Sequence, residues 1–255
     1  MKSPSRPWMV PACFFAAAAL VNLIARAMGN APVAAMVKPA LLPLIALTSV
    51  AAAGGMGSRA IRLLVIAQLL GCAGDIFLIG NGTLPLACGL GCFLAGHIFY
   101  FLLFGSISWK GLRVVQWLFI LGIKAVAVAA LLVAIGVKGA FLVPFAVYGM
   151  ALMFLISSGM AGILRSVGSP GIWWPVFLGA LLFTLSDSLI AVQMFHGAGV
   201  LLEFLVMLTY LTAQCLLAWG AVKLSADCPG ADFAHGGGRS GGGRRKTAIP
   251  PAGRG

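Results

Sequence analysis

Long apolar runs separated by short polar breaks organise this chain. Eight runs of about 20 residues recur along the sequence, and a helix of that length crosses a hydrocarbon core about 30 Å thick. Because the apolar residues are continuous rather than alternating, the runs predict helices and not the strands of a barrel. We place the spans at residues 8–27, 32–53, 61–79, 84–105, 114–135, 139–160, 173–195 and 200–222. The pattern predicts an all-α fold, a polytopic membrane helix bundle of eight transmembrane helices.

Composition and charge distribution favour a multi-pass membrane protein. Hydrophobic residues make up 61% of the 255 residues and charged residues 9%, against roughly 45–50% and 25% in soluble domains. Of the 17 Lys and Arg residues, thirteen fall on one side of the spans, two on the other and two within spans. Since cytoplasmic loops carry the basic excess, we expect both termini in the cytoplasm (N-in/C-in) and the chain in the inner membrane. Topology accounts for the net charge of +12, so the lipid bilayer is an expected partner and nucleic acid is not; the oligomeric state is left open.

The two ends of the chain differ from its middle. Residues 1–224 are expected to form the eight-helix transmembrane domain, and residues 225–255 a disordered, basic, Gly-rich cytoplasmic tail that cannot bury a core. Lys2 and Arg6 precede an apolar stretch that ends near Ala25-Arg26-Ala27, which imitates a signal peptide and its cleavage site. The stretch is longer than the apolar part of a signal peptide, so a retained first span is favoured and cleavage is the alternative.

Ionisable residues inside the spans are the first candidates for function. Three of the five acidic residues, Asp75, Asp187 and Glu203, fall in spans, where a charge is expensive and usually functional. Counted along their helices, these residues and Lys38 lie in the outer halves of four spans, so we expect opposite charges among them to pair. The alternatives are snorkelling to the interface for Lys38 and Glu203, and helix-to-helix hydrogen bonds for Asp75 and Asp187.

Other polar side chains extend this set inward. His97 and Tyr100, three residues apart, share one face of the fourth span. Glu203, Tyr210 and Gln214 form one polar stripe along the eighth span. We expect these faces to line a polar cavity that opens toward the outer leaflet. No metal or cofactor is expected, because only His97 among the histidines lies at depth, and no G-x-S-x-G motif indicates a serine nucleophile.

Several segments together resemble the YhhN family, whose characterised members are lysoplasmalogenases. In order along about residues 10–222, they are Lys38-Pro39 with the following LLPL, Gly74-Asp75, GLGCFLAGHIFY with His97 and Tyr100, GALLFTLSDSLIA around Asp187, and TYLTAQ ending at Gln214. The resemblance implies a membrane hydrolase of lipid metabolism. Such an enzyme cleaves the vinyl-ether bond of a lysoplasmalogen, an ether lysophospholipid, to a fatty aldehyde and a glycerophospho-base; a related lysolipid is the other candidate substrate.

This chemistry suits the intramembrane residues. A vinyl ether is cleaved by protonation of its β-carbon, followed by capture of the oxocarbenium ion by water. Desolvation keeps one carboxyl of a pair protonated, so we expect Asp75 and Asp187 to be the catalytic residues, one a general acid and the other a stabilising carboxylate. The expected substrate-binding or supporting residues are Lys38, His97, Tyr100, Glu203, Tyr210 and Gln214.

Two functions of other classes stay open. The segments LLGCAGDIFLI around Asp75 and LLFTLSDSLIA around Asp187 resemble each other, and internal repeats are typical of transporters. A proton-coupled small-molecule transporter is therefore one alternative. A non-catalytic lipid-binding membrane protein is the second, and it predicts that neither aspartate is needed for any reaction.

Overall fold

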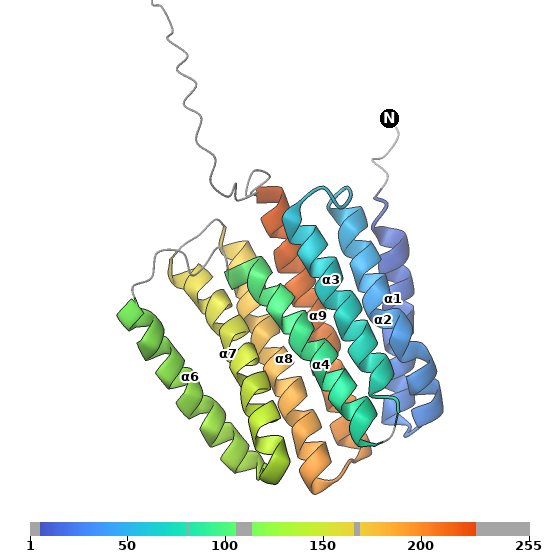
Figure 1. The fold of residues 1–255 in the computed structure, drawn as a ribbon. Helices are drawn as coiled ribbons and strands as arrows, with labels where there is room; N and C mark the ends of the chain where they lie inside the picture. Colours follow the sequence, from blue (N-terminus) through green and yellow to red (C-terminus); the bar gives the residue numbers. More distant parts are fainter. Residues whose placement is uncertain (1–5, 81, 106–113, 166–168, 228–255) are drawn as a thin grey trace, which may run out of the picture.

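The structure is a computed structural model that describes residues 6–80, 82–105, 114–165 and 169–227. Eight long helices run through these ranges, and no strand occurs in them (Figure 1). Their bounds are α1 (Met9–Ala27), α2 (Ala31–Ala52), α3 (Arg59–Phe77), α4 (Thr83–Tyr100), α6 (Val114–Ile135), α7 (Leu142–Leu164), α8 (Pro170–His196) and α9 (Val200–Asp227). A π-helical turn, η1 (Phe101–Gly105), extends α4, and a 3-10 turn, η2 (Gly139–Phe141), precedes α7.

The helices confirm the predicted polytopic bundle. Each predicted span coincides with one long helix to within a few residues. Seven helical segments are long and apolar enough to cross a membrane, and α6 adds a shorter apolar stretch over Ile120–Ile135. The chain is thus a multi-pass membrane protein, whereas the cytoplasmic placement of its termini stays a prediction. Helix α9 continues to Asp227, three residues past the expected domain boundary, and the rest of the predicted tail lies outside the described residues.

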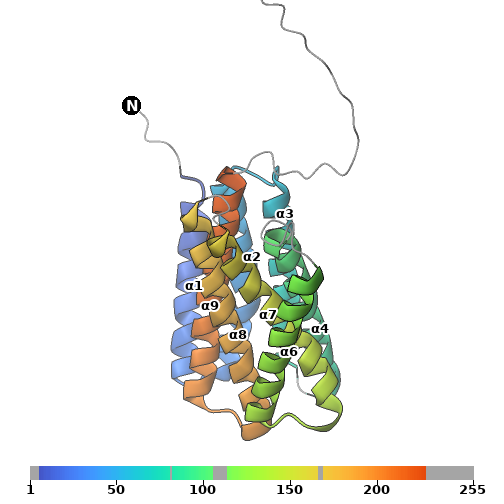
Figure 2. The same cartoon turned by 90° about the vertical axis from the view of Figure 1, so that its left-hand side faces the viewer.

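The helices stand side by side, and successive helices run in opposite directions (Figures 1 and 2). Helix α9 lies inside the bundle and contacts α1, α2, α3 and α8, while α6 stands at one edge against α7 and α8. The turns that join α1 to α2, α3 to α4, α6 to α7 and α8 to α9 gather at the lower end in Figure 1. We call this the distal end, because α1 begins and α9 ends at the opposite one.

Glycines let α7 and α8 approach each other closely. A Cβ atom added at Gly159 would lie 2.6 Å from the Cα of Phe177, and one at Gly162 would overlap the ring of Trp173. Lipid tails are as apolar as the helices, so membrane helices associate through such close contacts of small residues. The packing of α7 on α8 brings Tyr148 and Asp187 together at the site described below.

Two prolines fix how α2 meets α3. Proline has no backbone N–H, so Pro43 leaves the carbonyl of Pro39 without its helical donor. The thiol of Cys72 on α3 donates to that carbonyl, with Sγ 3.2 Å from the oxygen. Cys72 precedes Asp75 by one helical turn, and Lys38 precedes Pro39. This contact therefore sets the register at which Lys38 and Asp75 meet.

Candidate functional site

Asp75 is held by residues from two neighbouring helices. Its side chain, on α3, is 3% exposed. Lys38 of α2 places Nζ 2.9 Å from Oδ1, and the hydroxyl of Tyr210 on α9 donates to Oδ2 at 2.9 Å. The expected pairing of opposite intramembrane charges is present for these two residues. With an ammonium on one oxygen and a phenol on the other, Asp75 has the surroundings of an ionised carboxylate.

Asp187 has a different environment. The hydroxyl of Tyr148 on α7 donates to its Oδ2 at 2.6 Å, and Nε2 of His97 on α4 lies 3.6 Å from the same oxygen. His97 and Tyr148 are also in contact, with Nε2 3.2 Å from the phenol oxygen. No Lys or Arg is paired with Asp187 within the described residues. Its side chain is 11% exposed, more than that of Asp75.

Aromatic rings separate the two carboxylates. The ring of Phe183 lies 4.7 Å from that of His97 and 5.5 Å from that of Tyr210, measured between centroids. One ring therefore contacts both the group beside Asp187 and the group beside Asp75. Phe183 thus links the surroundings of the two carboxylates.

Tyr100 and Gln214 form a separate contact. Both are buried, at 1% exposure, and the hydroxyl of Tyr100 donates to Oε1 of Gln214, which links α4 to α9. Neither residue is in hydrogen-bonding contact with Asp75 or Asp187. Nearby along α3, the amide of Gln68 is buried with neither Oε1 nor Nε2 hydrogen-bonded within the described part of the chain. These polar groups are buried inside the bundle, and Gln214 lies near the Tyr210 hydroxyl, because a Cβ added at Gly71 would be 3.5 Å from that hydroxyl and 3.8 Å from Nε2 of Gln214.

At the distal end, Glu203 of α9 pairs with Arg26 of α1 rather than with Lys38. Nη1 of Arg26 lies 2.7 Å from Oε2 of Glu203. In the sequence, Arg26 stands out only in the Ala25-Arg26-Ala27 stretch that imitates a cleavage site. Because the pair joins the last turn of α1 to the first turn of α9, its distance along the chain hid it from any pattern of local spacing.

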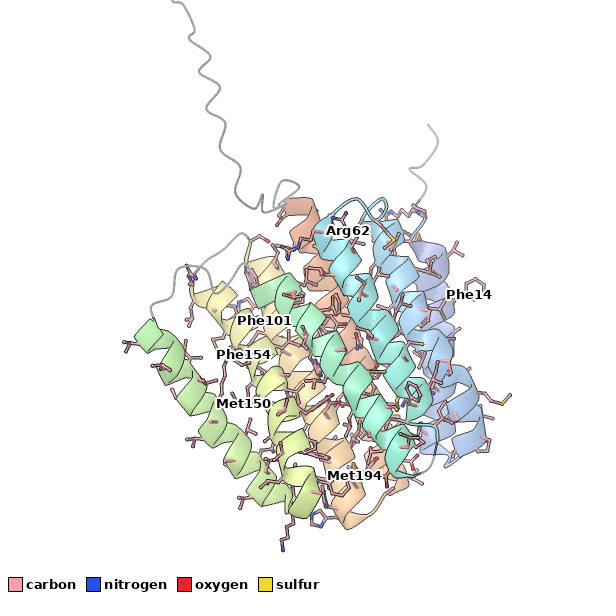
Figure 3. The ribbon with its side chains drawn as sticks, viewed as in Figure 1. Phe14, Arg62, Phe101, Met150, Phe154 and Met194 are labelled. Carbon is pink, nitrogen blue, oxygen red and sulfur yellow. The ribbon has the colours of Figure 1, made fainter. Side chains whose placement is uncertain are left out.

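Two cavities adjoin these residues. An apolar cleft lies between α4, α6, α7 and α8, and Asp187 and Tyr148 stand on its wall with Leu90, Phe93, Leu131 and Leu152. A polar pocket at the distal end is lined by Arg26, Lys38, Gln193 and Glu203 among other residues. The two cavities share four lining residues: Leu78, Leu86, Ile190 and Met194. Met194 marks this junction near the lower end of α8 in Figure 3.

The linings of the cleft and the pocket together match the chemical character of an amphiphile. Charged groups line one compartment and apolar side chains the other, and the shared residues make them adjoin. Asp187 is the acidic residue on the apolar side, while Lys38 connects the polar pocket to Asp75. The polar lining suits a charged headgroup and the apolar lining suits hydrocarbon.

Sequence reasoning missed Tyr148. The chain has three tyrosines, and the hydroxyl of each donates to a side chain on another helix. A phenol in the middle of an apolar span was therefore the available signal. Tyr100 and Tyr210 stand out in the sequence because each shares a helix face with other polar residues. Tyr148 does not, because it has no polar neighbour one helical turn away.

The serines of α7 and α8 contact backbone carbonyls, and possible metal ligands do not cluster in the described residues. Ser186 is buried and donates to the carbonyl of Val206 at 3.1 Å, and Ser157 and Ser158 donate to carbonyls of their own helix. In residues 6–80, 82–105, 114–165 and 169–227, no three His, Cys, Asp or Glu side chains gather as a metal would require.

Comparison with known proteins gives one family. The sequence model of the YhhN family matches residues 33–221. This range runs from α2 to α9 and includes both aspartates, Lys38 and Tyr148, but leaves out Arg26. No solved structure matches the chain with statistical significance.

Proposed function

This chain belongs to the YhhN family, and on that basis we propose that it is a membrane-embedded hydrolase of lysoplasmalogens or a related lysolipid. The reaction adds water across the vinyl-ether linkage and gives a fatty aldehyde and a glycerophospho-base. The observation that most supports this proposal is the position of Asp187, a carboxyl group on the wall of an otherwise apolar cleft. A lysophospholipid carries its vinyl ether where the hydrocarbon chain meets the polar head, which is the kind of junction at which this carboxyl lies.

The environments of the two aspartates favour different roles. Asp75 is paired with Lys38 and accepts a hydrogen bond from Tyr210, and both contacts stabilise a carboxylate at this position. Asp187 has no Lys or Arg partner in the described chain, and it is the aspartate on the wall of the apolar cleft, where the vinyl ether would lie. We therefore assign the general acid to Asp187 and the permanent carboxylate to Asp75.

The proposed reaction starts with proton transfer from Asp187 to the β-carbon of the vinyl ether. The carbon–carbon double bond supplies the electron pair, and the positive charge is shared by the α-carbon and the ether oxygen. The carboxylate left on Asp187 and the ionised Asp75 both stabilise this oxocarbenium ion electrostatically. Tyr148 holds Oδ2 of Asp187, which orients the other oxygen for proton transfer.

Water completes the reaction. It attacks the α-carbon while the Asp187 carboxylate takes its proton, which restores the acid and leaves a hemiacetal. The hemiacetal then loses its hydroxyl proton to the ether oxygen as the carbon–oxygen bond breaks, giving the aldehyde and the alcohol of the glycerophospho-base. His97, next to both Tyr148 and Asp187, is placed to relay this proton.

The test is aldehyde release by the purified full chain in detergent micelles. A 1-alkenyl lysophospholipid should yield aldehyde, whereas its 1-alkyl and 1-acyl analogues should not, because neither gives an oxocarbenium ion on protonation of carbon. Asp187→Asn should lower kcat by about 10²–10⁴-fold, the usual contribution of a general acid. Asp227→Asn makes the same chemical change at the exposed end of α9 and should leave kcat unchanged.

Two results would replace this proposal. If no lysolipid yields aldehyde but proteoliposomes carry a solute flux that depends on Asp75 and Asp187, the chain is a transporter. If lysolipids bind without either chemistry or flux, the chain is a lipid-binding protein. We also propose that the substrate reaches the site from the outer leaflet of the inner membrane. Comparing aldehyde release by intact cells with aldehyde release by inverted membrane vesicles tests that orientation.

A further inference from the structure

The polar pocket contains charged groups that the proposed proton transfers do not use. Arg26 and Glu203, 2.7 Å apart, keep 18% and 32% of their side chains exposed. Two nitrogen donors beside them, Nε of Arg26 and Nε2 of Gln193, are buried with no hydrogen-bond partner in the described parts of the chain. Because a buried donor without an acceptor is costly, this arrangement points to a ligand rich in acceptor oxygens.

The cations of the pocket suit a phosphate. The guanidinium of Arg26 has a planar set of donors that matches phosphate oxygens, and Nε is one of those left without a partner. Lys38 also lines the pocket, but its ammonium is held by Asp75 at 2.9 Å. Arg26 and Gln193 are therefore the donors best placed to hold a phosphate, with Lys38 adding positive potential.

Glu203 adds an anion at the same place. A phosphate that binds Arg26 competes with the Glu203 carboxylate for that guanidinium. A cation carried by the same ligand would then pair with the released carboxylate, so that positive and negative charges alternate through the pocket. This arrangement fits a zwitterionic headgroup that carries a phosphate and an amine.

The lining of the pocket further limits the type of amine. Its described lining residues include no Phe, Tyr or Trp. Quaternary ammonium groups are usually recognised by cages of aromatic rings, whereas a primary ammonium needs hydrogen-bond acceptors such as a carboxylate. Glu203 supplies such acceptors and nothing in the lining supplies a cage.

Building on the proposed function, we propose that this pocket is a headgroup site selective for phosphoethanolamine, with Arg26 and Gln193 binding the phosphate and Glu203 the primary ammonium. The hydrocarbon chain of the same lipid passes Leu78, Leu86, Ile190 and Met194 into the apolar cleft. Glu203 is then a specificity-determining residue for the headgroup and takes no part in proton transfer.

Binding of lipids that cannot react tests this site. The probes are 1-alkyl lysophosphoethanolamine, lysophosphocholine and lysophosphoglycerol, which share one saturated chain and differ only in the headgroup. Their Kd values are measured on the purified full chain in detergent. Wild-type protein should bind the ethanolamine lipid most tightly. Glu203→Gln should weaken that binding about tenfold, the usual effect of losing a hydrogen bond to a charged group. It should not weaken binding of the glycerol lipid, because Arg26 is then free of its competing carboxylate.

Control variants separate headgroup recognition from folding. Gln193→Leu should weaken the binding of all three lipids, because each carries the phosphate. This variant leaves the ion pair of Arg26 and Glu203 in place. Asp227→Asn removes a carboxylate far from the pocket and should change none of the Kd values. If loss of the ion pair prevents Glu203→Gln from folding, Glu203→Asp keeps the charge and should retain the preference for ethanolamine.

Specific results overturn the proposal. Equal Kd values for the three headgroups in wild-type protein, an equal change for all three in Glu203→Gln, or loss of the ethanolamine preference in Glu203→Asp each do so. Failure of the proposed hydrolysis is separate: it appears as selective binding of the ethanolamine lipid without aldehyde release from its alkenyl form. Aldehyde release with no headgroup preference in either KM or Kd rejects only the headgroup site.

Discussion

The hydroxyl of Tyr148 donates a 2.6 Å hydrogen bond to Oδ2 of Asp187, and this contact joins α7 to α8 on the wall of the apolar cleft. The same phenol lies 3.2 Å from Nε2 of His97 on α4. Tyr148 thereby connects three helices around one carboxyl group. Its position gives the proposed acid a fixed orientation, because only one of the two carboxyl oxygens is engaged by Tyr148.

Removing the Tyr148 hydroxyl should reduce catalysis. Tyr148→Phe leaves the ring against His97 but lets the Asp187 carboxyl rotate, so kcat for an alkenyl lysolipid should fall about tenfold or more. Thr212→Val is a matched loss of a hydroxyl on the exposed face of α9 and should leave kcat unchanged. The rate of aldehyde release measures kcat for each variant. An unaltered kcat in Tyr148→Phe would show that the Tyr148 hydroxyl has no role in the mechanism.

The pair of Lys38 and Asp75 should be strongly coupled in stability. Lys38→Met leaves a buried carboxylate without its cation and should lower the free energy of unfolding in detergent by about 3–5 kcal/mol. The double variant Lys38→Met/Asp75→Asn removes both charges and should recover much of that loss. Unfolding of the four proteins forms a double-mutant cycle. Additive effects would mean that the two charges do not stabilise each other.

Filling the apolar cleft should affect long hydrocarbon chains most. Leu131 lines the cleft from α6, so Leu131→Trp narrows the space next to Asp187. KM should rise for long-chain alkenyl lysolipids and change less for short-chain ones. Val126→Trp places the same bulk on α6 at a position that is 71% exposed, and should not alter KM. If the two variants change KM equally, the hydrocarbon tail of the lipid binds outside this cleft.

Close packing between α7 and α8 should be sensitive to a single methyl group. Gly159→Ala puts a Cβ 2.6 Å from the Cα of Phe177, so the helices must separate, and the free energy of unfolding should fall by about 1–3 kcal/mol. Gly122→Ala on α6 meets no atom within 4 Å and should stabilise its helix by up to about 1 kcal/mol. Thermal unfolding in one detergent compares the two variants, and equal shifts would contradict the close contact.

The buried amide of Gln68 should cost stability. Both of its polar atoms lack partners in the described residues, so Gln68→Met, which keeps a similar shape, should raise the free energy of unfolding by about 1–3 kcal/mol. Gln68→Glu adds a charge at the same position and should do the opposite. Destabilisation by Gln68→Met would indicate that the amide binds ordered water inside the bundle.

The helices and part of the site could be predicted because they depend on local sequence. Continuous apolar runs located the long helices of the described residues. A shared depth predicted that Lys38 would pair with one of three acidic residues, and the structure shows that its partner is Asp75. Prediction was less complete for Glu203, which was grouped by spacing with Tyr210 and Gln214. In the structure these three residues contact Arg26, Asp75 and Tyr100, respectively.

The sequence by itself determined that this is a helical membrane protein of the YhhN family with carboxyl groups at depth in its spans. Hydropathy is summed along one helix, so a membrane-spanning helix can be found without knowing which helices pack against it. Only the tertiary structure decided that Tyr148 faces Asp187, that Arg26 meets Glu203, and that an apolar cleft adjoins a polar pocket. These depend on which helices are adjacent and how each is rotated, and close packing at glycines such as Gly159 fixes both.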